Sequence, residues 1–276
     1  MFGEVIVGVD GGSAGRDAAA VARLLAGQDA HLALAYVHEL TPQRGASGAY
    51  GPIENEESRK LLAGEREALG IDAELLTVTS SSVGRGLHYL AEEHAADLLA
   101  VGSNARSFVG RVLLGDATRA ALIGAPCAVA IAPLGYASEA RAIAKIGVGY
   151  DGSPESEAAL ECARELASIH GAKLSALTVV EPSSYASLAR AVGAGTSQEE
   201  LVASAREALA ALDGVEGEVT VGLAGEELAS FGGGTDLLVV GSRGYGPIRS
   251  LMLGTTATHL AGSARCALLV LPRRAG

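Results

Sequence analysis

The chain has 276 residues, of which 49% are hydrophobic, 19% charged and 4% aromatic, and its net charge is −11. This composition is typical of globular proteins and excludes a disordered chain, and the negative charge argues against nucleic acid or an anionic membrane surface as the main partner. No apolar run approaches the roughly 20 residues needed to span a bilayer, which argues against a membrane protein.

In chain order, the first half alternates short apolar runs with amphipathic stretches. Apolar spacing of three and four residues predicts a helix over 14–27. The predicted strands cover 5–9, 31–37, 73–79, 97–101 and 127–133. Strands that alternate with helices predict an α/β fold with a parallel sheet covered on both faces.

The second half repeats this order. Asp151 follows Asp10 by 141 residues, the segment 173–182 matches 31–40, and "TDLLVVGS" (235–242) matches "ADLLAVGS" (96–103). Such constant spacing indicates a duplication. We predict two domains, 1–140 and 141–276, which pack together because no long flexible linker separates them.

Predicted elements of the second half include a helix over 154–170 and a strand over 217–223. In parallel sheets, ligands bind at the carboxyl ends of the strands, near the point where the strand order reverses. Asp10 and Asp151 are expected there because each ends the first strand of its copy.

A glycine series follows the predicted fourth strand of the second half, in "VVGSRGYGPIRSLMLGTTATHL" (239–260). Gly241 and Gly244 can bring bare backbone close to a ligand, and Gly254–Thr255 opens a helical stretch whose N-terminus favours phosphate. Turn glycines and a threonine N-cap are the structural alternative. Neither the P-loop nor the dinucleotide fingerprint is present.

The spacing Gly241-x2-Gly244-x9-Gly254-Thr255 resembles the ATP-binding signature of the universal stress protein family, G-x2-G-x9-G-[S/T]. The resemblance covers both halves, with first loops "VGVDGGS" and "VGYDGS". It implies two tandem Rossmann-like (adenine nucleotide α-hydrolase-like) domains, each a five-stranded parallel sheet flanked by helices, that form an intramolecular pseudo-dimer. It also implies an ATP-binding stress-response protein whose Mg²⁺ is held mainly by the phosphates.

The resemblance places the ATP site in the second domain. Asp151 would contact the ribose, although an acid after a strand is also a simple turn former, and the Val179 backbone would lie beside the adenine. The remaining residues would lie under the nucleotide or hold its phosphates: Val240, Gly241, Arg243, Gly244, Gly254, Thr255 and Thr256.

The first domain keeps the matching residues Asp10, Val37, Gly102 and Gly115. It departs at the phosphate positions, where Ala105 replaces Gly244 and Asp116 replaces Thr255. A carboxylate about 4 Å from a phosphate repels it by about 4 kcal/mol at an effective dielectric constant near 20. We therefore predict that the second domain holds ATP and that the first site is weak or vestigial.

No catalytic residue is predicted, because the six histidines show no acid–base partner in the sequence. The chain is expected to be a nucleotide-dependent regulatory or binding module rather than an enzyme. A slow ATPase or other adenine-nucleotide enzyme and an ATP-independent, chaperone-like interaction protein are the alternatives. Protein partners are unknown, and a further homodimer stays open.

The remaining expectations concern cysteines and location. Three cysteines without a CxxC pair argue against a zinc site or a disulfide framework, and Cys127 and Cys266 are expected to be buried as small apolar side chains. The opening segment does not resemble a signal peptide, so we expect a cytoplasmic protein with no resident metal ion.

Overall fold

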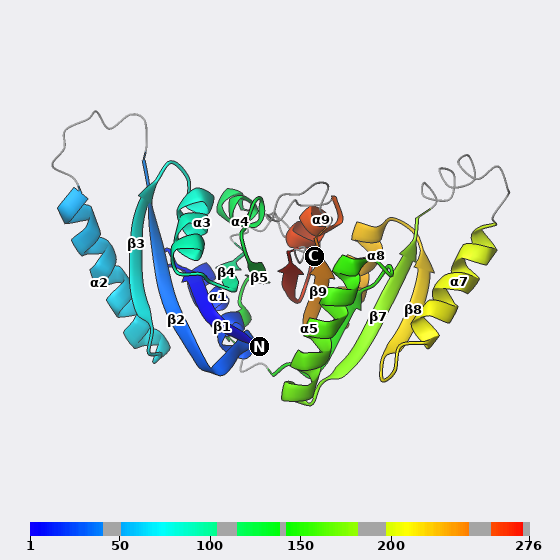
Figure 1. Ribbon diagram of the computed structural model, residues 1–276. Helices are drawn as coiled ribbons and strands as arrows, with labels where there is room; N and C mark the ends of the chain where they lie inside the picture. Colours follow the sequence, from blue (N-terminus) through cyan, green and yellow to red (C-terminus); the bar gives the residue numbers. More distant parts are fainter. Residues whose placement is uncertain (41–50, 104–114, 139–141, 182–196, 243–254, 273–276) are drawn as a thin grey trace. The chain divides into compact units, whose positions relative to one another are not determined.

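The computed structural model of the chain, drawn in Figure 1, places most of its residues. It describes residues 1–40, 51–103, 115–138, 142–181, 197–242 and 255–272. The described residues form two compact units, which divide between Arg141 and Ala142. We call them domain 1 and domain 2.

The elements of the two domains follow the same order along the chain. Domain 1 contains β1 (Phe2–Gly8), α1 (Ser13–Leu25), β2 (Ala26–Glu39), α2 (Gly51–Leu69), β3 (Glu74–Ser80), α3 (Val83–Glu93), β4 (Leu98–Gly102), α4 (Asp116–Leu122), β5 (Ala128–Ala132) and η1 (Tyr136–Ser138). Domain 2 contains β6 (Lys145–Gly149), α5 (Pro154–His170), β7 (Lys173–Val180), α7 (Gln198–Ala210), β8 (Glu216–Val221), α8 (Ala224–Gly232), β9 (Leu237–Gly241), α9 (Thr255–Ser263) and β10 (Ala267–Leu271).

All strand pairs within each domain are parallel. The order is β3-β2-β1-β4-β5 in domain 1 and β8-β7-β6-β9-β10 in domain 2. The predicted α/β fold with parallel sheets is therefore confirmed. In each domain the strand order reverses beside the first strand, at β1/β4 and at β6/β9, and this is the place where such sheets bind ligands.

Several element boundaries differ from the sequence prediction by a few residues. Helix α1 ends at Leu25, and β2 starts immediately at Ala26, whose backbone is extended and pairs with Phe2 of β1. This early pairing lengthens β2 beyond the apolar run from which a strand over 31–37 was predicted. The first strands also end at Gly8 and Gly149, two residues before the aspartates expected to end them.

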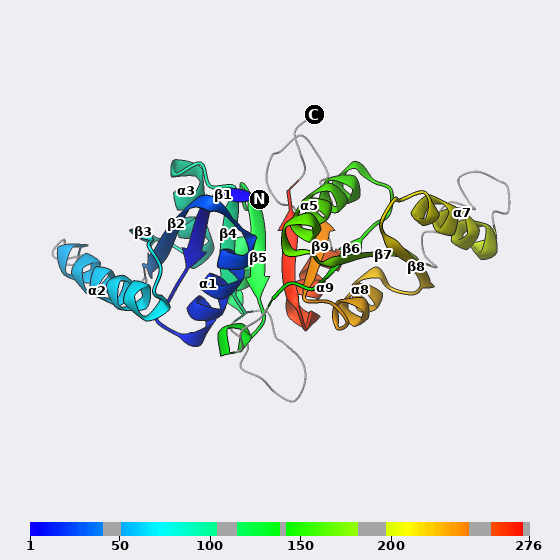
Figure 2. The same ribbon diagram turned by 90° about the horizontal axis from the view of Figure 1, so that it is seen from below.

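Helices cover both faces of each sheet, as Figure 2 shows. In domain 1, α1 and α2 pack on one face and α3 and α4 pack together on the other. Domain 2 repeats this with α5 and α7 on one face and α8 and α9 on the other. Strands β4, β5, β9 and β10 are apolar and almost fully buried, and the predicted burial of Cys127 and Cys266 is confirmed, with exposed fractions of 6% and 4%.

An aspartate before the fourth strand ties the amino ends of two strands together in each domain. The Asp97 carboxylate accepts the N–H groups of Gly3 and Glu4 at 2.9 and 3.1 Å. Asp236 does the same for the N–H groups of Ala144 and Lys145, both at 2.9 Å. The repeated contact fixes the register of the first strand, at the end of the sheet away from the carboxyl ends.

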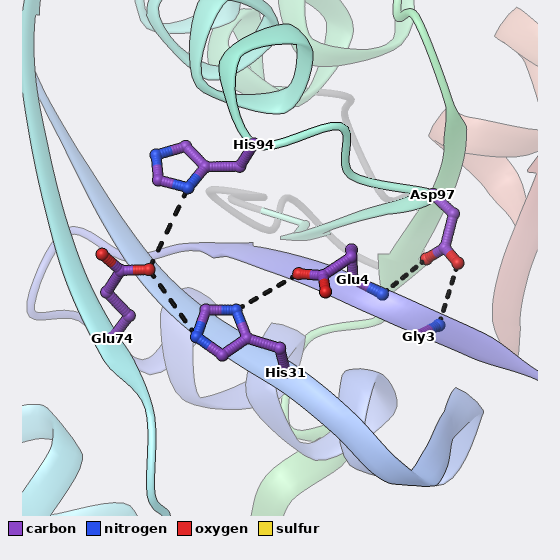
Figure 3. A network of polar contacts seen from close by, with 6 residues as sticks. All are labelled: Gly3, Glu4, His31, Glu74, His94 and Asp97. Atoms are coloured by element: carbon purple, nitrogen blue, oxygen red, sulfur yellow. Dashed lines mark hydrogen bonds and ion pairs between the residues drawn. The ribbon is translucent and has the colours of Figure 1, made fainter.

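Domain 1 adds a histidine–carboxylate cluster beside Asp97, drawn in Figure 3. His31 on β2 lies 3.2 Å from the Glu4 carboxylate on β1 and 3.6 Å from the Glu74 carboxylate on β3. His94, after α3, lies 4.0 Å from Glu74. These half-exposed groups link neighbouring strands at the amino ends of the sheet, so they take no part in the site described next.

Candidate functional site

Domain 2 has a cavity at the carboxyl ends of β6, β7 and β9, where the strand order reverses. Its described lining brings together five of the residues predicted for the nucleotide: Asp151, Val179, Val240, Gly241 and Thr256. The other lining residues are Gly149, Tyr150, Ser153, Glu155, Ser156, Leu177, Ala224, Leu228 and Ala257. Residues from both faces of the sheet thus meet around one opening.

Asp151 shapes the turn that leads into α5. Its Oδ1 atom accepts the N–H of Ser153 at 3.1 Å and also the Ser153 hydroxyl, while its own N–H donates to the Ser156 hydroxyl at 3.3 Å. Ser153 in turn caps the helix by accepting the N–H of Ser156. Asp151 therefore forms the turn, which was the structural alternative to a role in binding. It is also exposed and lines the cavity.

Val179 turns its main-chain groups toward the cavity. Along a parallel strand, the N–H and C=O of one residue point to the same side, and the side alternates from residue to residue. The carbonyl of Leu177 accepts the N–H of Tyr150 at 3.0 Å, on the side of β6, whereas the carbonyl of Val180 bonds on the side of β8. Val179 therefore faces the side of β6, but β6 has already ended at Gly149. The N–H donor and the C=O acceptor of Val179 therefore face the cavity.

Gly241 also has a packing role that the sequence did not reveal. A Cβ atom at this position would lie 2.5 Å from the Glu155 carbonyl oxygen in the first turn of α5. The end of β9 therefore touches helix backbone, which only glycine permits. The same holds at Gly102 in domain 1, where a Cβ atom would come less than 3.0 Å from the Ala14 carbonyl oxygen. Bare backbone at these two positions is needed by the fold, apart from any ligand.

The phosphate end of the predicted site is described in part. Helix α9 begins at Thr255, as predicted, and Thr256 lines the cavity. Arg243, Gly244 and Gly254 lie outside the described residues, so their predicted role stays a prediction.

The nine other lining residues of domain 2 were not predicted from the sequence, and three of them differ markedly in size from their counterparts in domain 1. Tyr150, Glu155 and Leu177 replace Val9, Ala14 and Ala35 of domain 1 and are all larger. Comparing the size of the matching side chains in the two copies, in addition to the glycine motif, could have identified these residues from the sequence. They leave a cavity of about 90 Å³.

The Tyr150 hydroxyl donates to the Glu157 carboxylate, one turn into α5. This hydrogen bond, together with burial and the nearby negative charges of Glu157 and Asp151, raises the pKa of Tyr150 to about 12. The tyrosine therefore stays neutral at physiological pH and acts as a fixed wall of the cavity.

Domain 1 has a matching cavity at the ends of β1, β2 and β4. Asp10, Val37 and Gly102 line it, as predicted, and its volume is about 310 Å³. Gly115 is the N-cap residue of α4, and the lining continues from there with Ala117 and Thr118. The Thr118 hydroxyl donates to the Gly102 carbonyl at 2.7 Å, which fastens α4 to the end of β4.

Asp116, the residue on which the predicted difference between the domains rests, is exposed in the first turn of α4. A carboxylate there stabilises the helix through its dipole. Ala105, the other predicted difference at the phosphate end, lies outside the described residues.

Two histidines of domain 1 have partners that the sequence did not indicate. His38 on β2 contacts the Ser58 hydroxyl on α2, and His88 lies 2.8 Å from the Ala121 carbonyl oxygen. Ser58 is only 3% exposed. Neither residue of the His38–Ser58 pair is among the described lining of the cavity. The pair therefore ties helix α2 to strand β2, outside the described lining of the cavity.

The repeated doubly wound sheet with a cavity at each reversal of strand order defines a tandem α/β protein. A model of the universal stress protein family matches residues 1–133 and again residues 142–272. The chain therefore belongs to the universal stress protein family.

Relatives of known name match almost the whole chain. Universal stress proteins of Mycobacterium tuberculosis and Mycobacterium bovis are each 27% identical over 288 residues, 96% of this chain and 96% of theirs. A crystal structure of a universal stress protein from Archaeoglobus fulgidus has a TM-score of 0.69 at 20% identity and covers 98% of both chains. A putative universal stress protein from Pseudomonas aeruginosa has a TM-score of 0.65 at 18% identity, covering 98% of this chain and 94% of its own. These solved structures share the fold.

Among the helices of the described ranges, none is both long and apolar enough to cross a membrane.

Proposed function

We propose that the chain is a nucleotide-dependent binding module of the stress response, and that domain 2 is its main ATP site, with Mg²⁺ held mainly by the phosphates. The observation that carries the proposal is the meeting of five predicted residues, from strands β7 and β9, helix α9 and the loop between β6 and α5, around one cavity. Its chemistry fits an adenine nucleoside. The main-chain donor and acceptor of Val179 suit the edge of the base, and the Asp151 carboxylate is an acceptor for ribose hydroxyls.

The phosphates belong beside the N-terminus of α9. This helix has nine residues and starts with Thr255 and Thr256, whose hydroxyl groups can donate to phosphate oxygens. The corresponding helix of domain 1, α4, has seven residues and starts with Asp116. A negative charge at that place opposes a phosphate, which supports ATP binding by domain 2 over domain 1.

We further propose that the module binds ATP without efficient turnover. The titratable groups in the described lining of the domain 2 cavity are Asp151, Glu155 and Tyr150. Asp151 is held in its turn by Ser153, and the pKa of Tyr150 is raised to about 12. Neither of these two is arranged as a general base for an attacking water, which leaves Glu155 as the candidate base within the described lining.

An exchange of residues between the domains tests the ATP site. Thr255→Asp copies Asp116 into domain 2, and Asp116→Thr makes the reverse change; each residue is already tolerated at the start of the equivalent helix. Calorimetric titration of the nucleotide-stripped chain with ATP and Mg²⁺ should give one site per chain. Thr255→Asp should weaken that site at least a hundredfold because of the added charge, and Asp116→Thr should leave it unchanged.

Two sites of equal affinity in the wild-type chain, or an unchanged isotherm in Thr255→Asp, would contradict the assignment to domain 2. Release of phosphate from ATP, measured on the same samples, checks the absence of turnover. Hydrolysis that persists in the purified chain and disappears in Gly244→Ala would favour the alternative that the chain is a slow ATPase.

A further inference from the structure

The outer edge of the domain 2 sheet is formed by β8, which pairs with β7 alone among the described strands of its domain (Figure 1). The N–H of Gly222 donates to the Val180 carbonyl at 3.2 Å, on the side of β7. Because the direction of the main-chain groups alternates along a parallel strand, those of Gly217, Val219 and Val221 point away from β7. These groups have no hydrogen-bond partner among the described residues. The edge therefore offers the N–H donors and C=O acceptors of three residues to another strand.

One face of this edge is apolar. A Cβ atom at Gly217 would lie 2.8 Å from the Leu209 Cβ atom, so the odd-numbered positions of β8 face α7. Val215, just before the strand, and Val219 and Val221 within it share this face. Val221 is 37% exposed. The face that α7 covers is therefore left partly open at the edge of the sheet.

A hollow of about 380 Å³ lies beside this face. Its described lining includes Leu209 and Ala210 of α7 together with Val215 and Val219. Leu223, which starts α8 just beyond the strand, is 58% exposed. The described side chains thus leave room beside the edge for the side chains of a further strand.

The opposite face of β8 carries two acids. The Thr220 hydroxyl lies 3.5 Å from the Glu227 carboxylate on α8, so the even-numbered positions face α8. Glu216 and Glu218 occupy this face, and both are exposed. Like charges directly opposite each other destabilise a strand pair. The two acids therefore decide which strand, and in which register, the edge can accept.

A second copy of β8, running antiparallel, matches the edge when a two-fold axis passes beside Val219. Val219 then lies opposite Val219 of the second copy, and Gly217 lies opposite Val221 of the second copy. All three residues point their main-chain groups outward, so each pair exchanges two N–H···O bonds. On the apolar face, the valines meet across the axis, and Val221 packs where Gly217 leaves space.

The same register separates the acids. Glu218 lies opposite Thr220 of the second copy, and Glu216 lies opposite Gly222 of the second copy. A register centred on Glu218 would set this acid against itself, and one centred on Gly217 would set Glu216 against Glu218. The charges of the edge therefore select the register centred on Val219.

We propose that two copies of the chain associate through their β8 edges, antiparallel and in the register centred on Val219. The same patch serves both copies, as a two-fold interface requires. This register also brings the exposed Leu223 toward Val215 of the second copy, beside the hollow. A ladder of this length buries a small area, so the association is weak and rises with concentration. The inference does not depend on ATP binding in either domain.

The edge strand of domain 1 supplies a matched control. By their pairing with β2 and β7, Thr77 and Thr79 of β3 occupy the positions of Val219 and Val221 of β8. The outer edge of domain 1 thus presents two threonines where domain 2 presents two valines. A change at Thr77 repeats a change at Val219 on an edge that the proposal leaves unpaired.

Sedimentation velocity of the full chain over a series of concentrations tests the association. Val219→Lys sets two ammonium groups opposite each other at the axis and should raise the dissociation constant of the dimer at least tenfold. Thr77→Lys adds the same charge to β3 and should leave the constant unchanged. Circular dichroism checks that both variants are folded. A wild-type chain that stays monomeric up to about 1 mM, or equal weakening by the two variants, would overturn the inference.

A cysteine at the axis tests the register with a change that keeps nearly the same side-chain size. The Cα atoms of a hydrogen-bonded antiparallel pair lie about 5.5 Å apart, within the range of a disulfide. Mild oxidation of Val219→Cys should therefore give a covalent dimer. The wild-type chain, Thr77→Cys and Val221→Cys should not cross-link, because Val221 lies opposite Gly217 and far from its own copy. A failure to cross-link at position 219, or equal cross-linking at 219 and 221, would contradict the proposed pairing.

Discussion

Single residues decide how closely strand ends and helices approach in this fold. Gly102 lies against the main chain of α1, where a Cβ atom would meet the Ala14 carbonyl oxygen at less than 3.0 Å. Backbone cannot move aside as a flexible side chain can. The glycines of the motif therefore have a structural function in both domains, including the one whose phosphate motif is degenerate, and this explains why Gly102 persists while the glycine at the place of Gly244 does not.

Gly102→Ala should lower the free energy of unfolding by about 1–3 kcal/mol, because the new methyl group overlaps helix backbone. Gly64→Ala is the matched control. Gly64 is exposed within α2, and a Cβ atom at this position would meet nothing within 4 Å, so alanine there should stabilise the chain by about 0.5–1 kcal/mol. Urea unfolding of the two variants measures both effects, and equal stability of the two would refute the close approach at Gly102.

Tyr150 gives a second test at the level of one side chain. Its pKa is raised to about 12, mainly by the hydrogen bond to Glu157, while the unfolded chain ionises near 10. The stability from this contact is therefore complete below pH 10 and is lost between about pH 10 and 12. Tyrosinate absorbance after rapid pH jumps should show a late-ionising component that belongs to Tyr150.

Glu157→Gln should shift that late ionisation toward pH 10, because the negative charge near the hydroxyl is removed. Tyr150→Phe should abolish the component and leave the other tyrosines unchanged. If the late component keeps its midpoint in Glu157→Gln, then burial alone holds the tyrosine neutral.

At the level of elements, the sequence predicted those parts of the fold that local chemistry determines. The helix over 154–170 is correct to the residue because Ser153 caps its start and Gly171, in the left-handed conformation, ends it. The helix predicted over 14–27 ended two residues too late, since Ala26 pairs with Phe2, a contact that no local pattern reveals. Where a strand begins and ends therefore depends on the residues of the neighbouring strand with which it pairs, and these residues are distant in the sequence.

The candidate site shows the same division. Asp151, Val179 and Gly241 were found because a repeated motif marks the strand ends. Tyr150 and Glu155 were missed because their importance lies in the volume that they take from the cavity. Volume is a property of several elements packed together, and it became visible only when the two domains could be compared in three dimensions.

At the level of the whole molecule, one duplicated fold presents two cavities that have diverged in opposite directions. Domain 1 keeps a roomy, apolar cavity with acids at its rim, and domain 2 keeps the phosphate motif but narrows the space for the nucleoside. We expect that exchanging matching side chains between the two domains changes the ligand affinity of each cavity, because the cavities differ at positions where each domain carries its own residue. Glu155 is the residue that most directly opposes ATP in domain 2, since it adds both bulk and negative charge.

Glu155→Ala copies Ala14 into domain 2 and should raise the affinity for Mg²⁺-ATP about thirtyfold. A carboxylate roughly 8 Å from a phosphate costs about 2 kcal/mol at an effective dielectric constant of 20, and the cavity also enlarges. Helix α5 would lose about 0.3–1 kcal/mol of dipole stabilisation. Glu199→Ala, in the first turn of α7 and outside the described lining of the cavity, is the control with the same change of charge. Calorimetry should show tighter ATP binding in Glu155→Ala alone; an equal gain in both variants would mean that net charge, and not the shape of the cavity, limits ATP binding.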